Sequence, residues 1–302
     1  MGNFRFVPDS ASPVVCSDFF DHVALVAHNC YQVKEKDHAS NVAFIGRLIA
    51  NGHLAMIEHH RFLFRLSEEA FAALSSLANP FQHLFVDKGR YYLSTSLRPL
   101  LEASDKEIPA FLFLSPALPE SVRAVLPERL QEGKDGAILV SPFDEDLEEE
   151  NRLDAVYETY HVITDRGVTH ELVRHRICSF AQESTRYCNY SKDKFENCLS
   201  FIAPFGYEER KEIYDDFFSK AAEAYFALIE KGARPEEARS VLPNALKASI
   251  MVTCSLREWL HIFALRCSPF AHPDIRRVMS KVRDDLFARG LLTEKERNAE
   301  EK

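Results

Sequence analysis

The sequence predicts an α+β fold whose C-terminal half is rich in helices. Short runs in which residues alternate in character, at Phe62–Arg65 and Val156–Thr164, have the two-residue period of β-strands. Longer stretches, at residues 42–49 and 202–232, repeat their apolar residues every three or four positions. This spacing is typical of amphipathic helices that cover one face of a core.

The composition is that of an ordinary folded protein. Of the 302 residues, 46% are hydrophobic and 27% are charged, and the length allows one large domain or a core domain with an insertion. The formal net charge of −9 argues against a protein that grips the backbone of a nucleic-acid polymer, because such proteins carry an excess of basic residues. A small anion in a local basic pocket is compatible with this charge.

Several features favour a cytoplasmic protein that does not associate with membranes. The first residues lack the apolar core of a signal peptide, and Phe6 stands where a myristoylation signal needs Ser or Thr. No apolar run approaches the roughly 18 residues of a membrane span. The seven cysteines include no CxxC pair, so we expect reduced thiols and assign no cysteine a catalytic role.

The helix that begins near Val42 is expected to end at Asn51-Gly52, just before a turn with the sequence HLAMIEHH. Ordinary core or capping histidines are one hypothesis for this turn, and a metal site is another. Zinc helices usually place their ligands four residues apart, whereas His53 and Glu58 are five apart. We therefore expect no metal.

Residues 67–153 are the least patterned part of the chain. Their SEEAFAALSSL stretch looks helical, a YYLSTSLR stretch follows a turn, and an acidic run, FDEDLEEENRLD, is typical of an exposed linker or a helix start. We predict that this segment is an insertion packed on the core.

The most informative stretch is RHRICSFAQESTRY, residues Arg174–Tyr187, which we call the signature segment. Thr169 is expected to cap a short helix that ends at the arginines. A guanidinium group matches the oxygens of a phosphate or carboxylate in a bidentate way, so adjacent arginines with interleaved hydroxyl groups favour an anion-binding site over a solvated turn.

Two helical stretches and one long apolar run follow the signature segment. The first helix is expected to end at Gly232, and Pro235 starts the second in its first turn. The predicted apolar side of the first helix consists of Ile213, Phe217, Tyr225, Leu228 and Ile229. In the run Ala245–Leu265, Arg257 and His261 are four apart and would share one face of a helix.

The spacing RHRxxSxxxxSxRY resembles the signature of the flavin-dependent thymidylate synthases. The turn HxxxxEH, and the block EEARSVLPNALKASIMVTCSLREWLHIFALR with its ARxVLP element, resemble two further blocks of that family. The resemblance spans residues 38–66 and 155–280 in the family's order. It implies a central, mostly antiparallel sheet flanked by helices, in a single domain over residues 1–302 with the insertion at 67–153.

The resemblance also implies an activity, the reductive methylation of dUMP to dTMP with 5,10-methylenetetrahydrofolate and NADPH through FAD, in a homotetramer with shared active sites. Arg266 would be the fixed cation at the uracil, and the implied catalytic residues are Arg266, Ser184 and His53. The implied cofactor contacts are Arg174, His175, Arg176, Gln182, Ser255, Arg257, His261 and Glu58. The implied dUMP contacts are Glu171, Arg174, Gln182, Glu183, Ser184, Thr185, Arg186, Arg239 from a neighbouring subunit, and Arg266.

The chain departs from the family pattern at a few positions. Ala55 stands where several relatives have a hydroxyl group, Ala181 and His261 where an Asn is frequent, and Phe270 where some have His, with His272 two residues later. One alternative keeps the flavin but methylates or hydroxymethylates another pyrimidine nucleotide. Another is an RNA-binding module that uses the RHR segment, which the acidic balance disfavours. A metal-dependent hydrolase built on the HLAMIEHH turn is a further alternative.

Overall fold

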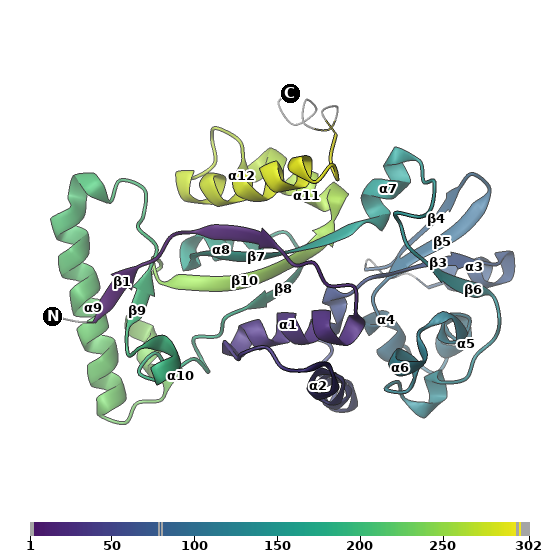
Figure 1. The fold of residues 1–302 in the computed structure, drawn as a ribbon, viewed down its shortest axis with the longest axis horizontal. Coiled ribbons are helices and arrows are strands. Elements are labelled where there is room, and N and C mark those ends of the chain that lie inside the picture. Colours follow the sequence, from purple (N-terminus) through teal and green to yellow (C-terminus); the bar gives the residue numbers. More distant parts are fainter. Residues whose placement is uncertain (1–2, 78, 80, 294–295, 297–302) are drawn as a thin grey trace.

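The computed structural model describes residues 3–77, 79, 81–293 and 296. Figure 1 shows an elongated molecule with a central sheet, a second sheet at one end, and a long helix at the other end. None of the described helices is both long enough and apolar enough to cross a membrane. All seven cysteines lie among the described residues, and they are free thiols as predicted.

The central sheet has four antiparallel strands in the order β2-β7-β10-β8. These strands are β2 (Ser10–Pro13), β7 (Tyr157–Asp165), β10 (Lys247–Ser255) and β8 (Ser179–Gln182). Helices α11 (Leu256–Arg266) and α12 (Pro273–Ala288) cover one face, and α1 (Phe19–Tyr31) covers the other (Figure 1). The fully buried Trp259 lies in the core between the sheet and the first pair of helices.

The second sheet is also antiparallel, in the order β4-β5-β3-β6. Its strands are β3 (Phe62–Leu66), β4 (His83–Asp87), β5 (Arg90–Thr95) and β6 (Ala137–Val140). The helical elements around it and around α1 are α2 (His38–Ala50), η1 (Ala55–His59), α3 (Glu68–Ser75), α4 (Arg98–Leu101), α5 (Ile108–Phe111), η2 (Ser115–Ala117), α6 (Glu120–Arg123), η3 (Glu128–Leu130) and α7 (Glu149–Ala155). Phe111 and Leu130 of the 67–153 segment lie in one core with Phe20 and Ile45.

The remaining elements pack at the far end of the central sheet. They are β1 (Phe4–Phe6), which pairs in parallel with β9 (Leu199–Phe201), together with α8 (Arg166–Leu172), η4 (Asp193–Phe195), η5 (Glu208–Arg210), α9 (Lys211–Glu230), α10 (Pro235–Ala238) and η6 (Arg239–Val241). Gly232 follows α9 with φ +89°, a conformation that favours glycine, so the predicted end of this helix is confirmed.

The α+β prediction and the antiparallel pairing are confirmed, but the strands form two four-stranded sheets instead of a single central one. The second sheet arises because residues 67–153 contribute β4, β5 and β6 as partners for β3. Whether this segment is an insertion stays a prediction. What the structure adds is that the segment shares its core with the N-terminal helices.

Three local expectations were wrong. Thr169 does not cap α8, because β7 runs directly into the helix and the Asp165 carboxylate accepts the Val168 N–H at 2.9 Å. The run Ala245–Leu265 is not one helix, since its first part is β10, which is buried on both faces and so shows no alternation. The apolar side of α9 was wrong at its first two positions, since Ile213 is 72% and Phe217 50% exposed, whereas Tyr225, Leu228 and Ile229 pack in the core as predicted, together with Phe218 and Ala222.

Candidate active site

The signature segment begins in a turn after α8 and then enters the edge strand β8. Helix α8 ends at Leu172, and the turn exposes Arg174 and Arg176 while it buries His175 between them. Within the described part of the chain, neither exposed arginine has a hydrogen bond or an ion pair with another side chain. The turn therefore offers two uncompensated guanidinium groups to an anionic partner.

Arg266 joins this turn to the end of α11. Its Nη1 donates to Glu171 Oε2 at 2.7 Å, and its Nη2 donates to the Glu171 carbonyl oxygen at 3.2 Å. Its Nε donates to His175 Nε2 at 3.2 Å, so His175 accepts through Nε2. The Arg266 side chain is only 18% exposed. The three contacts therefore hold a largely buried cation in one orientation.

His261 and Glu258 complete the cluster on the α11 side. Glu258 Oε1 lies 3.5 Å from His175 Nδ1, and the ring of the exposed His261 lies 5.7 Å from the ring of His175. These three residues are close enough together to hold a metal ion. However, His175 directs its Nε2 to Arg266 and its Nδ1 to Glu258, so neither ring nitrogen is free to bind one.

Strand β8 divides the predicted site residues between two faces of the central sheet. Cys178 Sγ lies 4.0 Å from Glu258 Oε1 on the α11 side. The next residue, Ser179, donates its hydroxyl to Glu58 Oε2 at 3.3 Å on the η1 side. Successive side chains of a strand point to opposite faces, so the cluster around Arg266 and the turn around Glu58 lie on different sides of β8.

Glu58 is also paired with an arginine that the sequence did not single out. Arg98, the first residue of α4, donates its Nη1 to Glu58 Oε1 at 2.7 Å and its Nε to Glu102 Oε1 at 2.9 Å. The side chains of Arg98 and Glu58 are 33% and 18% exposed, so this ion pair is better shielded from water than most surface pairs. Residues 67–153 thereby contact one of the predicted cofactor-binding residues.

Gln182 and Glu183 are held by other parts of the chain. Gln182 Nε2 donates to the Thr169 hydroxyl at 3.0 Å. The buried Glu183 accepts from Lys247 Nζ at 2.5 Å and from the Tyr190 hydroxyl at 3.0 Å, and burial raises the pKa of Tyr190 well above its usual value. Each oxygen of the Glu183 carboxylate thus has one internal donor.

The last residues of the signature segment face α10. Thr185 is buried, whereas Ser184 is half-buried and accepts the Arg186 backbone N–H at 3.3 Å. Arg186 is 57% exposed, and its Nε donates to Glu236 Oε2 at 3.0 Å. Arg239, three residues after Glu236, is exposed at the start of η6 and has no side-chain partner within the described ranges. No contact between described residues joins Arg186 or Arg239 to the Arg266 cluster.

Ser255 and Arg257 fix helix α11 in place. The Ser255 hydroxyl caps α11 by accepting the Glu258 N–H at 3.3 Å. Arg257 Nε donates to Asp154 Oδ1 at 2.6 Å, and its Nη2 donates to the Glu150 carbonyl oxygen at 2.7 Å. Arg257 therefore extends toward α7, although it lies one helical turn from His261.

A cavity of about 590 Å³ adjoins the signature segment. Tyr31 lines it and lies with its ring 5.3 Å from that of Tyr187, while the Cys30 carbonyl oxygen accepts the Ser184 N–H at 3.0 Å. The exposed His53 contributes to the wall. The other residues of the wall are Ala27, Cys30, Phe44, Leu48, Gly52, Leu54, Ala55, Met56, Arg98 and Glu102.

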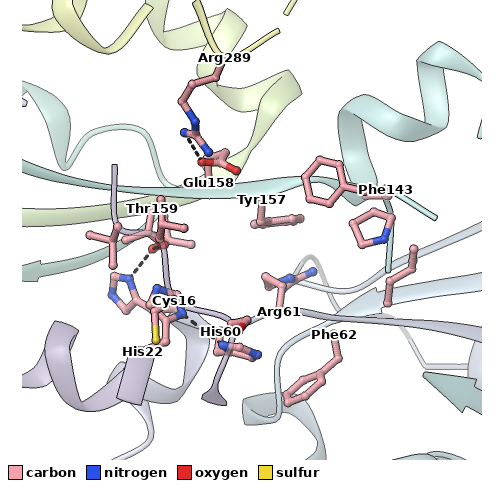
Figure 2. Close-up of a pocket in the computed structure, with 18 residues that line it drawn as sticks. Cys16, His22, His60, Arg61, Phe62, Phe143, Tyr157, Glu158, Thr159 and Arg289 are labelled. Carbon is pink, nitrogen blue, oxygen red and sulfur yellow. Dashed lines mark hydrogen bonds and ion pairs between the residues drawn. The ribbon is translucent and has the colours of Figure 1, made fainter. Parts of the chain in front are cut away.

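A second cavity, of about 320 Å³, lies between the start of β7 and the start of β3 (Figure 2). His22 Nδ1 lies 3.1 Å from His60 Nδ1, and the Arg61 guanidinium stacks 4.2 Å from the centre of the Tyr157 ring. Burial lowers the pKa of His22 to about 4 and that of His60 to about 3, so both rings are neutral.

The histidines of the HLAMIEHH turn do not converge on one point. His53 lies in the larger cavity, whereas His59 Nδ1 contacts the Thr253 hydroxyl at 2.6 Å and His60 faces His22. Among the described residues, the groups close enough to hold a metal contain none of these histidines. The hydrolase alternative therefore has no metal centre at this turn.

Sequence reasoning missed Arg98 and Tyr31, which line the larger cavity. Both meet the signature region through tertiary packing, and neither belongs to a motif with a fixed spacing. The YYLSTSLR stretch, which ends at Arg98, was the single local hint. At another predicted position, Phe270 is 99% exposed, and His272 caps α12 by accepting the Asp274 N–H at 3.3 Å.

Comparison with known proteins gives a match over the second half of the chain. Residues 146–288 match the family model described as thymidylate synthase complementing protein. The matched region holds the signature segment, three strands of the central sheet, α11 and α12. The HLAMIEHH turn and most of the 67–153 segment lie outside it.

Curated relatives agree with this family. The flavin-dependent thymidylate synthase of Geobacter sulfurreducens is 40% identical over 111 residues, which is 37% of this chain and 47% of that protein. That of Pyrococcus furiosus is 37% identical over 127 residues, 41% of this chain and 51% of that protein. That of Sulfolobus acidocaldarius is 38% identical over 122 residues, 40% of this chain and 45% of that protein. The chain spans about half the length of the curated relatives it matches.

Proposed function

We propose that this chain is a flavin-dependent thymidylate synthase, a family whose model and members its residues 146–288 resemble, and that it catalyses the reductive methylation of dUMP to dTMP. The one-carbon donor is 5,10-methylenetetrahydrofolate, and NADPH is the reductant through FAD. The observation that carries the proposal is the contact of Arg266 with His175 and Glu171, which joins two blocks far apart in the sequence. The seven free thiols fit a reaction in the cytoplasm.

The turn of the signature segment fits an anionic dinucleotide such as FAD. Arg174 and Arg176 present guanidinium groups without a side-chain partner among the described residues, which suit a pyrophosphate, and the exposed His261 offers an imidazole edge on the same side of the site. When bound, FAD supplies the hydride that it receives from NADPH. Ser255 and Arg257 act on this site by fixing α11, the helix that carries His261.

Arg266 stabilises the negative charge that develops on the uracil ring. Glu171 and His175 hold its guanidinium in place, so little reorganisation is needed as the charge forms. Ser184 accepts a hydrogen bond from the Arg186 backbone and keeps its own proton free for the substrate. His53 lies in the wall of the larger cavity, and we assign it to the folate side of the reaction.

The phosphate of dUMP is bound by Arg186 and Arg239. Arg186 is compensated by one carboxylate, Glu236, which leaves its Nη groups for the phosphate. Since Arg186 and Arg239 do not contact the Arg266 cluster within one chain, the site is completed by neighbouring copies in a homotetramer. Exposed apolar side chains on α9, Ile213 and Phe217, offer a surface for this assembly.

The colour and turnover of the purified protein test the proposal. We expect a yellow protein, or one that FAD makes yellow, which forms dTMP from dUMP, NADPH and methylenetetrahydrofolate. A protein that cannot take up FAD would contradict every flavin-dependent reading. A yellow protein that leaves dUMP unchanged but modifies another pyrimidine nucleotide would favour the alternative substrate.

A further inference from the structure

Arg98 is the cation of the larger cavity, and it comes from the segment that has no assigned role. The polypeptide turns after β5, and α4 begins with Arg98, which lines the cavity together with His53 and Tyr31. Tyr31 and the neighbouring Cys30 contact the signature segment. These contacts link the wall of the cavity to the signature segment, and residues 67–153 form part of that wall.

Two carboxylates fix the orientation of Arg98. Glu58 accepts from Nη1 at 2.7 Å, and Glu102 accepts from Nε at 2.9 Å. Glu58 is itself anchored by the Ser179 hydroxyl at 3.3 Å, so the signature segment positions Arg98 through Glu58. Within the described residues, Nη2 of Arg98 has no acceptor, so its two N–H groups are not committed to the chain; Arg98 lines both the larger cavity and a smaller one of about 180 Å³ beside Glu58.

The charges and the wall define the kind of ligand. One guanidinium faces two carboxylates, so an anionic group would gain little at this point and would be repelled by the excess negative charge. A carbonyl oxygen of an uncharged ring can accept from Nη2 without this cost. Phe44, Leu48 and Met56 supply apolar walls, and a volume of about 590 Å³ suits a fused heterocycle.

We infer that Arg98 donates a hydrogen bond to a ring carbonyl of a fused heterocyclic cofactor bound in this cavity, and that Glu58 and Ser179 serve to position Arg98. The inference rests on the proposed function, whose two cofactors each contain a fused heterocycle with a ring carbonyl. These rings are the pterin of the folate and the isoalloxazine of the flavin. Residues 67–153 are then a working part of the site.

Arg98→Met removes the donor and keeps most of the side-chain volume. We expect the variant to raise either the KM for methylenetetrahydrofolate or the Kd for FAD about tenfold to hundredfold. This is the change expected from the loss of one hydrogen bond from a charged donor. A change in KM identifies the pterin, and a change in Kd identifies the isoalloxazine. The KM for dUMP should not change, and Arg98→Lys should recover part of the loss because it keeps a cation beside Glu58.

Arg129→Met is the matched control, since Arg129 belongs to the same segment, pairs with the 95% exposed Asp105, and does not line the cavity. An active enzyme in which Arg98→Met folds normally and keeps both constants would overturn this inference alone. A loss of thermal stability with both constants unchanged would also overturn it, since the role would then be structural. Wild-type protein that binds no flavin and makes no dTMP would overturn the proposed function as well.

Discussion

Acid should destabilise this protein because it buries neutral histidines. Burial lowers the pKa of His22 to about 4 and those of His59 and His60 to about 3. In the unfolded chain each has a pKa of about 6.5. As the pH falls below this value, the unfolded chain binds protons that the folded chain does not. The contribution of these histidines to the free energy of unfolding is therefore fully present above about pH 6.5, and it is lost as the pH falls toward the folded pKa values.

The size of the effect follows from these pKa values. At about pH 5.5, one unit below the unfolded pKa, each histidine favours the unfolded state by about 1.4 kcal/mol. At about pH 7.5 the same term is close to zero. The three histidines together should therefore lower the free energy of unfolding by about 4 kcal/mol between these two pH values, a large part of the stability of an ordinary domain.

Urea unfolding at both pH values measures this difference, and Trp259, the single tryptophan, is a fully buried fluorescent reporter. In His59→Asn the amide takes the place of Nδ1 beside Thr253 but does not titrate. This variant should lose about one third less stability than the wild type on acidification. The exposed His38 is the control: Asp21 raises its pKa, so His38→Asn should not reduce the acid loss. Equal acid losses in wild type and His59→Asn would refute the reasoning.

Three further predictions concern the proposed reaction. Arg266→Ala should keep bound flavin yet lower kcat for dTMP formation about 10²- to 10³-fold, the typical value of one preorganised donor; a loss smaller than tenfold in a steady-state assay would contradict the role. Arg186→Ala should raise the KM for dUMP about tenfold. Glu236→Gln removes only the carboxylate partner of Arg186 and should not raise this KM. Equal KM values in the wild type and both variants would exclude Arg186 from the phosphate site. Replacing the exposed Ile213 and Phe217 with Ser should dissociate the tetramer in analytical ultracentrifugation, and an unchanged sedimentation coefficient would place the interface elsewhere.

Elements defined by local chemistry were predictable from the sequence. The end of α2 before His53, the short turn that follows, strand β3 and the stop at Gly232 are set by turn residues and by short-range periodicity. Elements defined by long-range packing were not. Strand β10 is buried on both faces, and a sequence pattern cannot distinguish such a strand from a buried helix.

The same distinction applies to the site. The signature segment was visible as an unusual density of polar residues, and the resemblance named Arg266 as its partner. Their contact through His175 is a tertiary fact that spacing alone does not contain. Arg98 shows the limit most clearly, because the two carboxylates that hold it come from different parts of the chain, one from the following helical turn and one from η1.

The arginines near the site differ in whether the chain itself neutralises them, and this difference separates two kinds of role. Arg174, Arg176 and Arg239 are exposed and have no carboxylate partner in the described ranges, so a bound phosphate can supply their counter-charge. Arg266 and Arg98 are held by carboxylates of the same chain. A neutralised arginine attracts an anion weakly, but its N–H groups have a fixed direction. Donors that are already oriented before the reaction begins are suited to two tasks. They can stabilise charge on a ring, and they can recognise a ring carbonyl. We therefore propose phosphate binding for the free arginines and ring chemistry for Arg266 and Arg98, whereas Arg186, which Glu236 pairs only through Nε, keeps its Nη groups for a phosphate.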